Sequence, residues 1–159
     1  MKTIEFTLNG ALRQFDIEPD ETLIDLLRRV GLTGTKRGCD TGMCGSCAVI
    51  MDGRAINACI LFAFQAAGRT IETIEGIGDF DQPHPLQVAM ADAGAVQCGF
   101  CTPGIVMTAK ALLEEKPDAD EADFRQHLDG NLCRCTGYVK IKEALLSCSA
   151  NETASGEAS

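Results

Sequence analysis

The sequence of 159 residues contains no tryptophan, and aromatic residues make up only 5% of it. Its hydrophobic fraction of 45% is nevertheless ordinary for a globular protein, so its core must consist mainly of aliphatic side chains. Basic residues are also scarce, because 14 Lys and Arg oppose 23 Asp and Glu and leave a net charge of −9. This balance argues against binding to nucleic acid, whose phosphates require a basic surface, and against binding to anionic membranes.

Long apolar runs are absent as well. No stretch approaches the roughly 20 apolar residues of a membrane-spanning helix, and Glu5 and Asp16 interrupt any apolar core of a secretory signal near the N-terminus. We therefore expect a cytoplasmic protein whose nine cysteines are reduced rather than paired in disulfides. Reduced cysteines that occur in sets of four are typical of metal sites.

The first half of the chain has the pattern of short strands around one helix. Apolar and polar residues alternate over residues 3–8, and Asn9-Gly10 predicts a tight hairpin turn into a second strand. Thr22 and Asp25 predict the capped start of a helix that ends at Gly31. The expected strands are 3–8, 13–17, 48–51, 54–58 and 70–74. Together these elements predict a small α+β domain over residues 1–76.

The second half has helical patterns instead. A Gly- and Asp-rich segment at 77–83 predicts a linker, and short apolar stripes predict four helices in a domain over residues 84–148. The expected helices are about 85–93, 102–116, 120–128 and 138–148. Four short helices of this kind predict a small all-α bundle. Residues 149–159 are small and polar, which predicts a disordered tail.

Four cysteines of the first half follow the spacing C-x4-C-x2-C-x11-C, which is the spacing of a plant-type [2Fe–2S] ferredoxin. They are Cys39, Cys44, Cys47 and Cys59. Glycines lie between and beside the first three, and glycine lets backbone N–H groups approach the sulfurs of an anionic cluster. A structural zinc site also accepts four cysteines, and disulfides are a further alternative. Three ligands within nine residues favour the iron–sulfur interpretation.

A second set of four cysteines is predicted at the turns of two helical hairpins. The pair Cys98 and Cys101 precedes one helix, and the pair Cys133 and Cys135 precedes another. Helix N-termini favour thiolates and an anionic cluster, because their N–H groups are unpaired and their dipole end is positive. This spacing alone does not separate iron–sulfur from zinc. Cys148 is left over, and we expect it to be a free buried thiol.

The chain resembles the small iron–sulfur subunits of the molybdenum hydroxylases, the xanthine dehydrogenase family. The resemblance extends over residues 3–148 and rests on four long stretches. They are LTGTKRGC at 32–39, CGSC at 44–47, QCGFCTPG at 97–104 and GNLCRCTGY at 130–138. The resemblance implies a ferredoxin-like (β-grasp) domain followed by a helical [2Fe–2S] domain.

The same resemblance implies roles for particular residues. The first cysteine set would hold the cluster farther from the molybdenum, the second set would hold the nearer one, and Gln97 would contact a molybdenum pterin dinucleotide. That cofactor would lie on a large partner subunit, and electrons would leave to FAD on a medium subunit or to an external acceptor. No substrate site is expected on this chain. The alternative function for this chain is that of a free-standing two-cluster ferredoxin, which carries electrons without being part of a larger enzyme.

Overall fold

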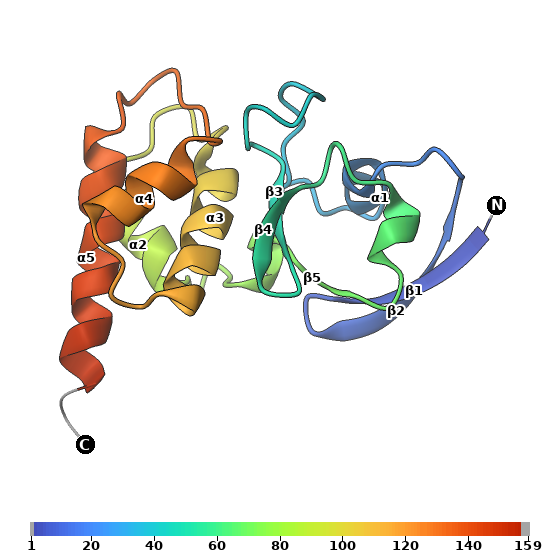
Figure 1. Cartoon of the computed structure of the whole chain (residues 1–159), viewed down its shortest axis with the longest axis horizontal. Coiled ribbons are helices and arrows are strands. Elements are labelled where there is room, and N and C mark those ends of the chain that lie inside the picture. Colours follow the sequence, from blue (N-terminus) through green and yellow to red (C-terminus); the bar gives the residue numbers. More distant parts are fainter. Residues whose placement is uncertain (1, 157–159) are drawn as a thin grey trace.

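A five-stranded mixed sheet forms the first half of the molecule, with the strand order β2-β1-β5-β3-β4 (Figure 1). The computed structural model describes residues 2–156. Its strands are β1 (Lys2–Leu8), β2 (Ala11–Ile17), β3 (Ala48–Met51), β4 (Arg54–Asn57) and β5 (Thr70–Glu72). β1 pairs parallel with β5, whereas the other ladders are antiparallel. The predicted α+β class is therefore confirmed.

The local signals of the first half act as the sequence predicted. Asn9 and Gly10 both adopt left-handed conformations, with φ of 49° and 78°, and join β1 to β2. The Thr22 hydroxyl accepts a hydrogen bond from the Asp25 N–H and caps α1 (Leu23–Arg29). Four apolar residues of α1 are fully buried in the core of this half. They are Leu23, Ile24, Leu26 and Leu27. The sheet and α1 thus share one core, from which the loop after α1 emerges.

Four α-helices form the second half (Figure 1). They are α2 (Pro85–Asp92), α3 (Thr102–Glu115), α4 (Glu121–Leu128) and α5 (Val139–Gly156). Two short 3-10 helices, η1 (Ala63–Ala66) and η2 (Ile74–Gly76), lie on either side of β5. Helix α3 contributes most to the helical core, since nine of its residues are buried. Within residues 2–156, no helix is both long and apolar enough to cross a lipid bilayer.

Helix α5 continues past Cys148, where the sequence predicted its end, and runs to Gly156. The predicted disordered tail, 149–159, is therefore helical over most of its length. Ser149 is buried, and its hydroxyl donates a hydrogen bond of 2.7 Å to the Ala119 carbonyl. That hydrogen bond holds Ser149, the first residue of 149–159, against the core. Adding residues to an existing helix costs less free energy than nucleating a new one, so α5 continues beyond Cys148. Residues 157–159 lie outside the described part.

The two halves pack against each other through α3 and β3. Ile50 of β3 is buried against Met107 and Ala111 of α3, in a small core separate from those of the two halves. The Lys110 ammonium, on the same helix, lies 2.7 Å from a Glu72 carboxylate oxygen of β5. This interface brings the N-terminus of α3, which follows Cys101, towards the loop that precedes β3.

Candidate iron–sulfur centres

The first cysteine set lies around the N-terminal end of β3. Cys39, Cys44 and Cys47 occupy the loop between α1 and β3, and the β3–β4 hairpin returns the chain so that Cys59 follows β4. The Cys47 carbonyl accepts a 3.3 Å hydrogen bond from the Ala58 N–H, which fixes Cys59 beside the loop. The hairpin therefore gathers the four thiols that the spacing predicted to lie together.

Glycine is required where this loop approaches its own cysteines. A Cβ on Gly38 would lie 2.8 Å from the Cys44 sulfur, closer than a carbon and a sulfur can approach. Gly42 and Gly45 both have positive φ, at 75° and 67°, a conformation that glycine adopts without strain. The loop therefore brings its backbone close to the thiols, as the binding of an anionic cluster requires.

The second cysteine set gathers at one end of the helical half. Cys101 is the N-cap residue of α3, and no side chain caps that helix. Cys98 and Cys135 lie with their sulfurs 3.6 Å apart, although 37 residues separate them in the chain. Cys133 lies in the same loop as Cys135, between α4 and α5. The structure thus brings together both cysteine pairs that the sequence placed at separate helical turns.

Within each set the thiols approach one another as neighbouring pairs. In the first set Cys39 contacts Cys44 and Cys47 contacts Cys59. In the second set Cys98 contacts Cys135 and Cys101 contacts Cys133. Across residues 2–156, no three His, Cys, Asp or Glu side chains surround one point as a single metal ion requires. Two pairs of thiols match the arrangement of a [2Fe–2S] cluster, in which each iron takes two cysteines.

Each set combines an acidic thiol with a buried one. Hydrogen bonds from Thr41, and then from the Met43 N–H, lower the pKa of Cys39 to about 6. Burial raises the pKa of Cys133, but hydrogen bonds from Thr136 and the Cys135 N–H outweigh it, and the pKa falls to about 7.

The buried thiol of each set behaves in the opposite way. Burial raises the pKa of Cys47 and of Cys101 to about 12. A thiol of this kind binds as thiolate only where a metal cation compensates the buried charge. Each set therefore combines one thiol whose ionisation hydrogen bonds favour with one whose thiolate needs a cation beside it.

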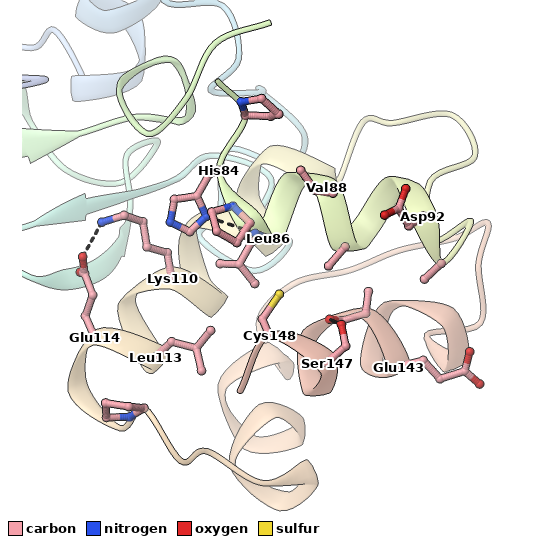
Figure 2. Close-up of a pocket in the computed structure, with 16 residues that line it drawn as sticks. His84, Leu86, Val88, Asp92, Lys110, Leu113, Glu114, Glu143, Ser147 and Cys148 are labelled. Atoms are coloured by element: carbon pink, nitrogen blue, oxygen red, sulfur yellow. Dashed lines mark hydrogen bonds and ion pairs between the residues drawn. The ribbon is translucent and has the colours of Figure 1, made fainter. Parts of the chain in front are cut away.

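Cys148 belongs to neither set and lies on α5 in the helical core, among the pocket residues that Figure 2 draws. It is buried on α5 and lines a cavity of about 870 Å³ together with Leu86 of α2 and Leu113 of α3. It is about 14 Å along the helix axis from Val139, where α5 begins after the second set. The predicted buried location of this thiol is thus confirmed.

Four polar residues that sequence reasoning did not assign to the sites contact the cysteine loops. The Asn57 amide donates to the Gly42 carbonyl at 2.8 Å, and the Thr136 hydroxyl lies 3.1 Å from the Cys133 sulfur. Asn131 donates to the Gly45 carbonyl, and Tyr138 bonds to the Cys133 N–H. Asn131, Thr136 and Tyr138 belong to the stretch GNLCRCTGY on which the resemblance rests, whereas the sequence signal of Asn57 is that it lies two residues before Cys59.

Each half of the chain matches a protein family of its own. Residues 6–68 match a 2Fe-2S iron–sulfur cluster binding domain, and residues 73–146 match a [2Fe-2S] binding domain. The nicotinate dehydrogenase small FeS subunit of Eubacterium barkeri is 48% identical over 144 residues, which cover 90% of this chain and 92% of that relative. The chain belongs to the small iron–sulfur subunits of the molybdenum hydroxylases.

Other members of the family are similar over most of the chain. The xanthine dehydrogenase iron-sulfur-binding subunit of Escherichia coli O157:H7 is 46% identical over 149 residues, covering 92% of this chain and 93% of that one. A chain of quinoline 2-oxidoreductase from Pseudomonas putida 86 superposes with a TM-score of 0.91 and 43% identity, covering 98% and 97% of the two chains. The aldehyde oxidoreductase of Desulfovibrio gigas gives a TM-score of 0.93 at 39% identity, with 18% of its longer chain matched.

Family membership confirms the class of function predicted from the sequence. These small subunits are the electron-transfer components of oxidoreductases, and the ferredoxin-like domain followed by a helical [2Fe–2S] domain is their fold. The relatives are named as subunits of larger enzymes rather than as independent carriers. The alternative of a free-standing ferredoxin is therefore not favoured.

Proposed function

We propose that this chain carries electrons from a molybdenum pterin dinucleotide on a large partner subunit to FAD on a medium subunit or to an external acceptor. The observation that carries the proposal is the direct contact between the two cysteine loops. The Leu132 N–H, next to Cys133, donates a 2.9 Å hydrogen bond to the Cys44 carbonyl. This contact holds the two cysteine loops side by side, so electrons could pass from a centre on one loop to a centre on the other.

We propose that each cysteine set holds one [2Fe–2S] cluster. The first set is Cys39, Cys44, Cys47 and Cys59, and the second is Cys98, Cys101, Cys133 and Cys135. When bound, each cluster supplies a one-electron redox centre. The two families match 6–68 and 73–146, and the buried side chains form one main core in each half. These findings support a division into two domains, which we propose to be 1–76 and 84–148 with the linker 77–83.

We propose that the large subunit covers the second set. Cys98 and Cys135 are exposed, and three large apolar side chains near them are exposed as well. They are Val96, Phe100 and Leu132, with exposed fractions of 41%, 45% and 56%. Apolar side chains gathered beside a functional loop are typical of a surface that a partner protein covers. Reduced thiols and the absence of a spanning helix among residues 2–156 are consistent with a cytoplasmic complex.

The cluster count tests this proposal directly. The complex as purified should contain about four irons and about four acid-labile sulfides for each copy of this chain. After full reduction, electron paramagnetic resonance should show two distinct signals, because one set lies beside a sheet and the other at helix N-termini. One signal that integrates to a single spin per chain, or zinc in place of iron, would contradict the two-cluster assignment.

Gln97 tests the proposed contact with the pterin. Its side chain is exposed beside Cys98, so it is available to a partner. Gln97→Ala should leave both clusters intact and slow their reduction by the substrate of the complex, since a buried polar contact of about 1–3 kcal/mol would be lost. Reduction by dithionite, which bypasses the pterin, should be unchanged. Substrate reduction at the wild-type rate, with unchanged pterin retention, would show that Gln97 does not make this contact.

A further inference from the structure

One short segment, residues 130–133, ties the second cysteine loop to the first. The Leu132 N–H donates to the Cys44 carbonyl at 2.9 Å, and the Asn131 side-chain amide donates to the Gly45 carbonyl at 3.2 Å. Both acceptors are consecutive residues of the first loop. Asn131 is only 4% exposed, so its hydrogen bond is shielded from water. The segment therefore connects a proposed ligand of one cluster, Cys44, with a proposed ligand of the other.

The side chain of Leu132 does not hold this segment in place, because it is 56% exposed. The Tyr138 hydroxyl holds it instead. It donates to the Asn131 carbonyl at 2.9 Å and accepts from the Cys133 N–H at 2.7 Å. These two groups flank Leu132 on either side. One oxygen atom thus fixes both neighbouring peptide groups and with them the direction of the Leu132 N–H.

The backbone of Tyr138 has a conformation that is rare for its residue type. Its φ is 68°, in the left-handed region, which a bulky side chain rarely adopts. Within residues 2–156, the other non-glycine residues with positive φ are Asn9, Asp40 and Asp52, and Asn and Asp are the types that tolerate it. Tyr138 is also the single tyrosine of the sequence. Strain of this kind persists where surrounding contacts require it and is concentrated at functional sites.

We propose that Tyr138 is a positioning residue whose hydroxyl sets the coupling between the two clusters. The hydroxyl acts through the segment 130–133, because it holds the Leu132 N–H in its hydrogen bond to the Cys44 carbonyl. The inference rests on the proposed function, because it requires that both clusters are present. It adds a group outside both ligand sets that determines how rigidly the sets are joined.

Tyr138→Phe in the purified complex tests the inference, because it removes one oxygen and keeps the ring. Iron and sulfide contents should stay at wild-type values. The spin–spin splitting between the two reduced clusters should become smaller. Hydrogen–deuterium exchange of the peptide that contains Leu132 and Cys133 should become about tenfold faster, while exchange in β1 stays unchanged.

Two further variants sharpen the result. Asn131→Ala removes the neighbouring tie to Gly45 and should change the splitting in the same direction. Ser147→Ala is the matched control, because it removes a hydroxyl that donates a hydrogen bond within α5, to the Ala144 carbonyl at 2.7 Å. It should leave both the splitting and the exchange unchanged.

A particular set of outcomes would overturn the inference. If Tyr138→Phe lowers the melting temperature but leaves the splitting and the Leu132 exchange at wild-type values, Tyr138 only supports the fold. If the wild-type complex itself lacks two cluster signals, the proposed function fails. The exchange comparison would then still decide whether the hydroxyl fixes the segment.

Discussion

Cys98→Ser should remove about half of the iron and sulfide, so that about two irons remain for each chain instead of about four. Cys98 lies 3.6 Å from Cys135 and precedes α3, so its loss leaves the second set with three thiols. A serine hydroxyl is a poor substitute for the soft thiolate that iron–sulfur clusters require. One of the two paramagnetic signals should therefore disappear, and the other should keep its shape.

The same variant should also interrupt electron flow almost completely. Substrate should no longer reduce the remaining cluster, because the proposed route from the large subunit passes through the second set. Dithionite should still reduce it. Loss of both signals would instead mean that the two sets are not independent, and retention of both would show that Cys98 is not a ligand.

Cys148→Ser provides the matched control for this experiment. It makes the same chemical change on a cysteine that lies in the helical core, beside Leu86 and Leu113 (Figure 2). We expect full iron content and both signals. Loss of iron in this variant would show that the division of the nine cysteines into two sets and one cysteine outside both sets is wrong.

The local structure of the first half could be predicted because its signals are short-range. Asn9-Gly10 specifies a left-handed hairpin turn by itself, and Thr22 with Asp25 specifies a helix start. The cysteine spacing likewise reflects a requirement of the cluster rather than of distant residues. Each of these features depends on a few residues that are adjacent in the sequence, so each is visible without a structure.

The joint between the two halves consists of the hydrogen bonds from Leu132 to Cys44 and from Asn131 to Gly45. It could not be predicted, because it depends on contacts between residues far apart in the chain. Asn131 and Gly45 are separated by 86 positions, and neither residue type indicates the other. The left-handed conformation of Tyr138 was equally invisible, since tyrosine ordinarily argues against it. The helical extent of α5 beyond Cys148 also depends on a distant contact, between Ser149 and Ala119.

Gly45→Ala should strongly destabilise this joint. Gly45 has φ of 67°, and an added Cβ would lie 2.3 Å from the Gly130 carbonyl oxygen and 2.5 Å from the Asn131 amide nitrogen. The first overlap is with backbone, so no side-chain rotation can relieve it. A Cβ on Gly104 of α3 would in turn lie 2.2 Å from the Gly45 carbonyl oxygen, so the backbone is closely packed on both sides.

The two halves must therefore separate slightly to accept the extra methyl group. We expect Gly45→Ala to lower the free energy of unfolding by about 2–4 kcal/mol, from left-handed strain together with overpacking. Denaturant unfolding of the purified chain measures this change. Since the joint also holds Cys44 opposite Leu132, the spin–spin splitting between the reduced clusters should become smaller in the variant.

Gly53→Ala separates the two causes. Gly53 lies in the β3–β4 turn with φ of 82°, and an added Cβ would meet nothing within 4 Å. It carries the same conformational penalty without the clash, so we expect a loss of only about 1–2 kcal/mol and unchanged splitting. Equal losses in the two variants would contradict the close packing at Gly45. A larger loss at Gly45, accompanied by the altered splitting, would show that one glycine controls both the stability of the interface and the separation of the two redox centres.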